Sequence, residues 1–138
     1  MDGKATWKYG LSFDGTGTSG FTLPMGTSVE KGGLGDGFSP MELVLVGLAG
    51  CTAMDVISIL EKKRQSVKNF EVRVHGERAA DHPKVYTSIQ VEYVVTGEQI
   101  DRSAVERAVD LSVGKYCSVS AMLAKTAVIE HVITVVEG

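Results

Sequence analysis

Residues 39–65, SPMELVLVGLAGCTAMDVISILEKKRQ, are the stretch that decides the fold. Its first four residues form a capping box with proline at the first helical position, because the Ser39 hydroxyl can accept from the Glu42 N–H. Nothing after it breaks a helix except two tolerated glycines, Gly47 and Gly50. The stretch therefore predicts one helix ending at about Gln65, with a length on the order of 36–39 Å.

This helix is apolar on almost every side over its first five turns, so it is either a membrane span or the buried axis of a fold. A span would place Asp55 inside the bilayer at considerable cost. It would also leave the strand-rich remainder of the chain without a core. We therefore expect no membrane, and a helix covered on most sides by protein, including a second subunit.

Working back from the helix, residues 31–38 are rich in glycine and predict a flexible linker. Phosphate binding is not expected there, because no Gly-Lys-Ser/Thr closes the loop and the glycine spacing is not that of a dinucleotide fingerprint. Residues 14–20 predict a turn between two alternating segments, and Pro24 favours an edge position for the second. The first segment, residues 5–13, predicts one half-buried strand with four large side chains on one face: Trp7, Tyr9, Leu11 and Phe13.

Working forward, residues 70–95 predict two long strands joined by a turn at residues 81–83. A second capping box, Ser103 to Glu106, predicts a short amphipathic helix that Gly114 ends. Ser118 is expected to cap a third helix, and residues 128–136 are β-branched and strand-like. The order ββ-α-ββ-α-α-β predicts the α+β class, with mostly antiparallel sheets, in a single domain over residues 1–138.

Composition excludes several classes of function. The 138 residues are 43% hydrophobic and 22% charged, which does not fit intrinsic disorder. The net charge is −3 and basic residues are scattered, so no nucleic-acid partner is expected. The N-terminus lacks the apolar run of a secretory signal, and two distant cysteines do not make a disulfide framework. We expect a cytoplasmic protein with reduced thiols.

Cys51 lies in the middle of the long helix, beside Gly50 and one turn after Gly47, with Asp55 one turn later on the same face. Each glycine costs the helix roughly 1 kcal/mol relative to alanine. Such a cost suggests the close approach of another backbone or access for a small ligand. From position alone, Cys51 can be a small core residue or a nucleophile.

Cys117 follows Lys115 and precedes the helix expected at Ser118. A helix N-terminus and a nearby ammonium both favour the thiolate, which predicts a lowered pKa and a reactive thiol. A semi-buried turn cysteine is the alternative. The three histidines lie in separate segments without metal-ligand spacing, and His131, within a strand, is interpreted as structural.

Taken together, residues 39–51 resemble the central-helix motif of the OsmC/Ohr family, in which an Asn/Ser-Pro start leads through small residues to a reactive cysteine. Residues 115–119, KYCSV, are similar to the second-cysteine motif of that family. Residues 60–65 and 109–112 resemble its YhfA-like branch in particular. The resemblance covers nearly the whole chain, and two cysteine motifs in this order are a specific signal.

The resemblance implies an intertwined homodimer whose long helices pack between two sheets. It also implies a peroxidase that reduces organic hydroperoxides in an oxidative or osmotic stress response. Cys51 would attack the peroxide as thiolate and become a sulfenic acid, and Cys117 would condense with it into a disulfide. An external dithiol would reset the pair, as lipoyl groups do in the Ohr branch. No metal or tightly bound cofactor is implied.

The sequence departs from the peroxidatic pattern of the family at two positions. The family's activating arginine near the N-terminus is missing, since the first arginine is Arg64, about 20 Å along the helix from Cys51. Its glutamate position holds Met41, and the adjacent Glu42 is assigned to capping. Three hypotheses therefore remain: a hydroperoxide-reducing thiol peroxidase, a non-peroxidatic disulfide-handling protein, and a module that binds a small apolar ligand at the dimer interface, in a pocket lined by Gly47 and Gly50.

Overall fold

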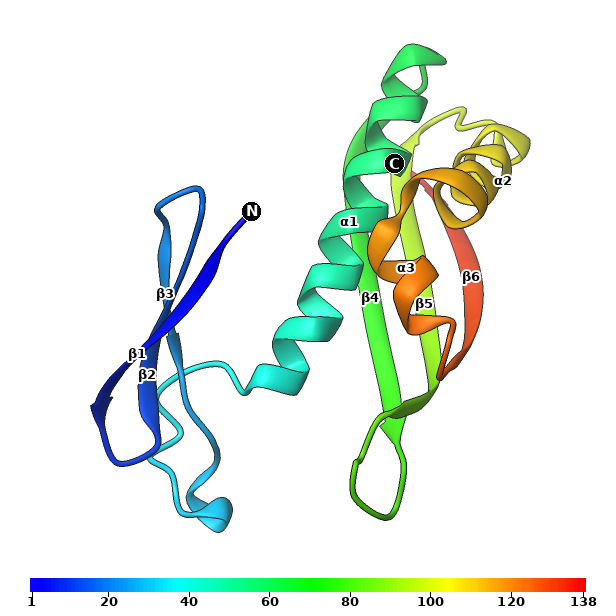
Figure 1. Cartoon of the computed structure of the whole chain (residues 1–138). Coiled ribbons are helices and arrows are strands. Elements are labelled where there is room, and N and C mark those ends of the chain that lie inside the picture. Colours follow the sequence, from blue (N-terminus) through cyan, green and yellow to red (C-terminus); the bar gives the residue numbers. More distant parts are fainter. The chain divides into compact units, whose positions relative to one another are not determined.

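The computed structural model describes all 138 residues, which form two compact units, Met1–Val44 and Leu45–Gly138. The boundary falls near the start of the long helix α1, Pro40–Lys62 (Figure 1). The mixed α+β class and the long helix are both as predicted. That the chain forms a single domain stays a prediction.

The first unit is a three-stranded antiparallel sheet in the order β1-β2-β3, formed by Gly3–Tyr9, Ser12–Gly17 and Thr22–Met25. The prediction of one strand over residues 5–13 is wrong. The chain reverses at Gly10, whose φ of 52° lies in the left-handed region, and Trp7 therefore lies opposite Phe13. Large apolar residues alternate with small or polar ones throughout residues 7–13, so the sequence pattern gives no sign that the chain turns back at Gly10. Pro24 is confirmed on an edge strand, because β2 is the only strand beside β3 in this sheet and an isolated bridge from Met25 to Phe38 is the further pairing of β3.

The glycine-rich segment before α1 is a folded loop, and the prediction of a flexible linker is wrong. Asp36 accepts from the Ser12 hydroxyl over 2.8 Å and from the Tyr9 hydroxyl over 3.3 Å. A Cβ built on Gly37 would lie 2.6 Å from the Pro24 carbonyl carbon. The glycine is thus required for close backbone packing, which the local sequence does not distinguish from flexibility.

The start of helix α1 is as predicted. The Ser39 hydroxyl accepts from the Glu42 N–H over 3.3 Å. The helix ends at Lys62, and Arg64 then adopts a left-handed conformation with φ of 56°. By length and composition α1 could cross a membrane, but within this chain one stripe of it is buried in the fold: Leu48, Thr52, Val56 and Leu60.

The second unit contains the sheet β4-β5-β6, formed by Ser66–Arg78, Tyr86–Glu98 and Val128–Glu137. The two long strands β4 and β5 pair antiparallel as predicted, whereas β6 runs parallel to β5. Figure 1 shows α1 and α3 in front of this sheet. Alternate residues of β5 form the centre of the core: Ile89, Val91, Tyr93 and Val95.

The parallel pairing requires a crossover between β5 and β6. It consists of α2 (Arg102–Leu111), the π-helical turn η2 (Ser112–Tyr116) and α3 (Ser118–Leu123). Three predicted boundaries are wrong here. The cap of α2 is Asp101, which accepts from the Ser103 N–H, and Glu106 pairs with Arg102 instead of capping. Gly114 does not end α2, because α2 ends at Leu111 and Gly114 lies within η2. Cys117 rather than Ser118 caps α3.

Candidate functional site

The two cysteines, far apart in sequence, meet in the second unit. Cys51 is half-buried on α1, and Cys117 lies between η2 and α3 with only 3% of its surface exposed. Both are free thiols, and the two side chains lie near enough to each other that the Cys51 thiol raises the pKa of Cys117. The fold thus brings together the two residues that the sequence singled out for thiol chemistry.

The expectation of a lowered pKa at Cys117 is wrong. Burial raises the pKa of this thiol to about 11, and both the Cys51 thiol and the Asp55 carboxylate add to the rise. The Ser120 N–H, which donates to the Cys117 sulfur over 3.3 Å, lowers it only in part. The Lys115 ammonium lies 5.2 Å from the centre of the Tyr116 ring. The rise in the pKa of Cys117 caused by burial of the sulfur is therefore larger than the fall expected at the start of a helix.

Behind the thiols lies a buried group of polar side chains that joins α1 to η2. Thr52, next to Cys51, has its hydroxyl 2.9 Å from the Ser112 hydroxyl. Ser112 donates to the Asp55 carboxylate over 2.8 Å. Thr52 and Ser112 are 1% and 0% exposed, so these hydrogen bonds satisfy groups that water does not reach. They fix the position of the Asp55 carboxylate beside the cysteines.

The same group of side chains continues into the sheet. The Tyr93 hydroxyl on β5 lies 3.0 Å from the Thr52 hydroxyl and 3.0 Å from His131 Nδ1 on β6. Burial raises the pKa of Tyr93 to about 12, so the phenol stays protonated. Burial also lowers the pKa of His131, against the opposing effect of Asp110 on α2, which favours the neutral ring. Tyr93 and His131 are stacked, with ring centroids 5.9 Å apart.

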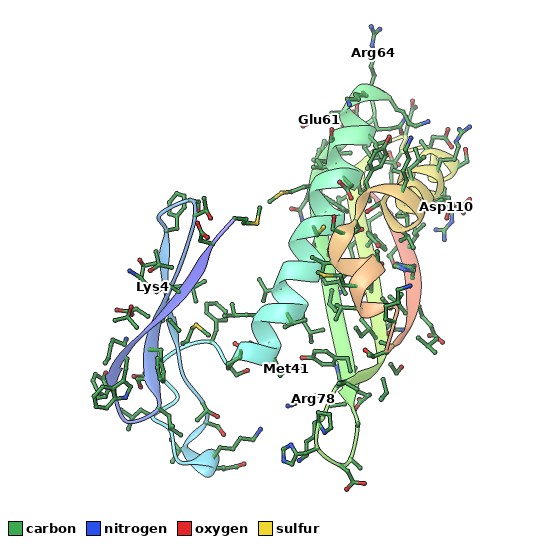
Figure 2. All side chains as sticks on the ribbon, viewed as in Figure 1. Lys4, Met41, Glu61, Arg64, Arg78 and Asp110 are labelled. Atoms are coloured by element: carbon green, nitrogen blue, oxygen red, sulfur yellow. The ribbon has the colours of Figure 1, made fainter.

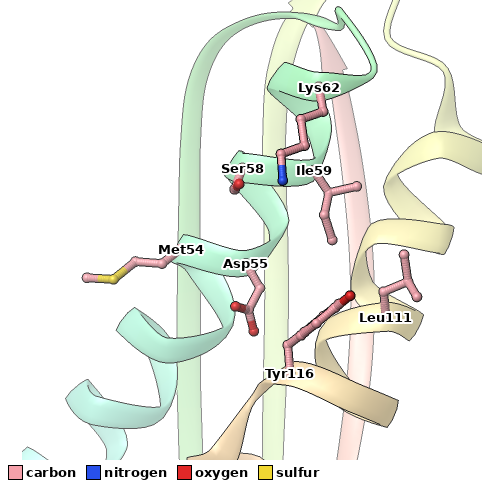
Figure 3. A pocket seen from close by; sticks show the side chains of 7 residues that line it. All are labelled: Met54, Asp55, Ser58, Ile59, Lys62, Leu111 and Tyr116. Atoms are coloured by element: carbon pink, nitrogen blue, oxygen red, sulfur yellow. The ribbon is translucent and has the colours of Figure 1, made fainter.

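A cavity of about 380 Å³ opens beside Asp55 between α1 and the part of the crossover formed by the end of α2 and η2 (Figure 3). Figure 3 shows the Tyr116 ring extending toward Leu111, with Asp55 and Ile59 on the α1 side, whereas Met54 points away. Ile59 and Leu111 make its wall partly apolar, and Lys62 supplies an ammonium. The arrangement can hold a small amphipathic molecule beside Asp55, and neither cysteine is among the residues that line the cavity.

Neither Gly47 nor Gly50 lines this cavity, and a Cβ built on either would meet nothing within 4 Å. Within one chain, therefore, no backbone approaches these glycines. They lie on a face of α1 that also carries Val46, 52% exposed, and Met54, 72% exposed. This face of the helix is open in the single chain.

The arginines of the chain are engaged away from the thiols. Figure 2 shows Arg64 pointing beyond the C-terminal end of α1, and Met41 at its opposite end. Arg73 pairs with Glu71 and Glu92 on the sheet. The remaining three act elsewhere: Arg78 donates to the Lys84 carbonyl, Arg102 pairs with Glu106, and Arg107 acts on Asp101. In one chain, the activation of Cys51 by arginine has no structural counterpart.

Known proteins resemble this chain in both sequence and fold. The sequence model of the OsmC-like protein family matches residues 33–132, most of the chain and the segment that includes both cysteines. The chain belongs to the OsmC-like family. This OsmC-like protein is 44% identical to Protein YhfA of Escherichia coli strain K12 over 132 residues, which are 95% of each chain. The resemblance to the family and to its YhfA-like branch is thereby confirmed.

Solved structures confirm the OsmC-like fold. A hypothetical protein from Aquifex aeolicus VF5 is 32% identical, with a TM-score of 0.87 over 99% of this chain and 96% of that one. The organic hydroperoxide resistance protein OhrB of Bacillus subtilis is 17% identical, with a TM-score of 0.62 over 97% and 98% of the two chains. At that identity the second similarity shows the fold alone.

Sequence reasoning placed Asp55 on the same helix face as Cys51, but it did not find the other polar residues behind the thiols of this OsmC-like protein. Thr52 and Asp55 are hydrophilic positions within an apolar helix, which is a detectable signal. Tyr93 occupies the buried face of a strand otherwise lined by aliphatic residues, where a phenol needs a partner. Ser112 carries no such signal, because its burial depends on the π-helical turn that follows α2.

Proposed function

We propose that this OsmC-like protein is a thiol-dependent redox protein that reduces organic hydroperoxides through Cys51 and Cys117. The proximity of two free thiols, near enough that Cys51 raises the pKa of Cys117, is the observation that carries the proposal. Membership of the OsmC-like family supports it, and a protein of this fold in Bacillus subtilis is named an organic hydroperoxide resistance protein. The cavity beside Asp55 has room for a small organic hydroperoxide.

The reaction takes place in two steps. In the first, the Cys51 thiolate attacks one peroxide oxygen, the O–O bond breaks, and the leaving alkoxide takes up a proton to become the alcohol. In the second, the Cys117 sulfur attacks the sulfenic acid, an S–S bond forms, and the hydroxide that leaves takes up a proton to become water. An external dithiol, of the lipoyl type, then reduces the disulfide and is itself oxidised.

A homodimer is part of the proposal. The open face of α1 carries two exposed apolar side chains, Val46 and Met54, beside two glycines that permit close approach of another helix. A second copy covering this face would remove the apolar surface from water and bring further residues to Cys51. A cytoplasmic location, where thiols are kept reduced, suits a protein that depends on two free cysteines.

A second candidate function is disulfide handling without peroxide reduction. Two observations favour it: the raised pKa of Cys117, and the engagement of the arginines away from the thiols. A thiol without an activating cation reacts slowly with peroxides, whereas a pair in contact still exchanges with disulfides. The two candidates differ in the oxidant, not in the residues.

The deciding experiment titrates free thiols in the reduced protein before and after one equivalent of cumene hydroperoxide, with intact mass recorded alongside. The peroxidase proposal predicts loss of both thiols within seconds and a mass lower by two hydrogens. Cys117→Ser should stop at the sulfenic acid, with a mass higher by one oxygen, and Cys51→Ser should leave Cys117 reduced.

Persistence of both thiols with cumene hydroperoxide, together with rapid loss on adding oxidised lipoamide, would instead establish the disulfide-handling function. A ligand-binding role for the cavity, independent of the thiols, would be indicated by apolar ligand affinity that survives Cys51→Ser.

A further inference from the structure

Five side chains from four elements form one continuous hydrogen-bond chain through the core. In the order of the hydrogen bonds, its members are Asp55 on α1, Ser112 on η2, Thr52 on α1, Tyr93 on β5 and His131 on β6. The four links measure between 2.8 and 3.0 Å. The three central members are buried, and the two ends, Asp55 and His131, are half-buried.

The direction of this chain follows from the number of hydrogens available. Ser112 donates its only hydroxyl hydrogen to the Asp55 carboxylate, so it must accept from Thr52. Thr52 has then used its hydrogen and must accept from Tyr93. Tyr93 in turn must accept from His131, which requires the hydrogen of the imidazole to be on Nδ1. In each of the four hydrogen bonds, therefore, the donor is the residue nearer to His131 and the acceptor is the residue nearer to Asp55.

The two ends of the chain differ in a way that suits proton delivery. Asp55 contacts the cavity and raises the pKa of the Cys117 thiol by its charge, which places the carboxylate beside the reacting sulfurs. His131 lies on an edge strand of the sheet, and its second nitrogen, Nε2, is not used in the chain. Asp110 on α2 is the charged group that acts on this ring.

We propose that His131, Tyr93, Thr52 and Ser112 are positioning residues that relay a proton from the edge of the sheet to Asp55, which gives it to the leaving oxygen at the thiols. This inference rests on the proposed function and deepens it, because both steps of the thiol cycle release an anionic oxygen that must be protonated.

The relay balances. His131 takes a proton at Nε2 from a solvent water, which is left as hydroxide in the solvent, and passes the Nδ1 hydrogen to Tyr93. Each hydroxyl passes one hydrogen onward and receives one, and Asp55 becomes a carboxylic acid that protonates the alkoxide. His131 is left neutral with its hydrogen on Nε2. Rotation of the three hydroxyls and exchange of the imidazole hydrogen restore the starting direction.

The test uses the full-length reduced protein and two substitutions at one position. Thr52→Val keeps the shape of the side chain and removes the hydroxyl, whereas Thr52→Ser keeps the hydroxyl and is the matched control. With cumene hydroperoxide, we expect Thr52→Val to lose its thiols about tenfold or more slowly than wild type, and Thr52→Ser within about twofold. Added imidazole buffer should restore part of the Thr52→Val rate, which a purely structural role would not produce.

A second measurement needs no turnover. ¹⁵N NMR of histidine-labelled protein should show His131 with its hydrogen on Nδ1, and Tyr93→Phe, which removes the acceptor, should shift it toward Nε2. Equal rates for the two Thr52 variants, or a wild-type His131 with its hydrogen on Nε2, would overturn the relay alone. Persistence of the wild-type thiols would overturn the peroxidase function and, with it, the role of the relay.

Discussion

Ser112 donates its hydroxyl hydrogen to Asp55 over 2.8 Å, and this hydrogen bond fastens the π-helical turn to the long helix beside the two cysteines. The residue is fully buried and also accepts from Thr52. One serine hydroxyl therefore satisfies two buried polar partners on the neighbouring helix.

Replacing Ser112 by alanine should consequently cost stability. Thr52 would lose its acceptor in a place that water does not reach, and the half-buried Asp55 would lose a donor, so we expect the free energy of unfolding to fall by about 1–3 kcal/mol. Urea unfolding of the reduced protein measures this. Ser58→Ala, at an exposed position of α1, is the control and should stay within about 0.5 kcal/mol of wild type. Equal stability of the two variants would contradict the fastening role.

The raised pKa of Cys117 predicts a dependence of stability on pH. The native thiol, with a pKa of about 11, holds its proton more tightly than the unfolded thiol. Its contribution to stability is therefore complete below the unfolded pKa and is lost as the pH rises through about 11. Urea unfolding under reducing conditions at a series of alkaline pH values should show this decline.

Cys117→Ala should make that decline shallower without abolishing it. Tyr93, with a pKa raised to about 12, contributes a loss of the same sign at higher pH. An identical pH slope in wild type and Cys117→Ala would show that the native thiol titrates as an unfolded one does.

The open face of α1 gives a prediction about assembly. In a homodimer that covers this face, Val46→Lys would place an ammonium in an apolar contact, so we expect the dimer dissociation constant to rise at least about tenfold. Sedimentation velocity over a dilution series measures it. Val128→Lys, at a valine of β6 that is 71% exposed, is the matched control. A dimer equally tight in both variants would place the interface elsewhere.

Two glycines of the second unit should respond in opposite ways to alanine. A Cβ at Gly76 would lie 2.7 Å from the Tyr86 ring and 3.4 Å from Leu45, so Gly76→Ala should destabilise the protein by about 1–3 kcal/mol. A Cβ at Gly114 would meet nothing within 4 Å, and Gly114→Ala should be neutral or stabilise by up to about 1 kcal/mol. Urea midpoints compare them; equal effects would contradict the close packing at Gly76.

The elements that the sequence predicts correctly are those set by local chemistry. The start of α1 depends on Ser39 and its neighbours, and β4 and β5 on alternation over many residues, so both follow from the sequence alone. At Gly10 a strand pattern and a turn residue occur together, and near the start of α2 both Asp101 and Ser103 could cap the helix. Which of the two possibilities forms depends on the rest of the fold. The packed loop at Gly37 depends on a backbone distant in sequence.

For the site, the two cysteines are evident from their motifs, but their environments are not. The signal at Cys117 was a helix start and a neighbouring lysine, whereas burial against Cys51 and Asp55 decides its pKa. The direction of the shift therefore depends on contacts between α1 and the crossover. Residues more than fifty positions apart make those contacts, and no local pattern encodes them.

The parallel pairing of β6 with β5 has a consequence for the synthesis of the chain. Cys117 lies in the connection between these strands, and β6 leaves the ribosome after it. The connection is anchored at both ends only when β6 has paired, so a nascent chain that still lacks β6 carries Cys51 on its helix without a fixed partner. The two cysteines are thus held together only once β6 has been synthesised.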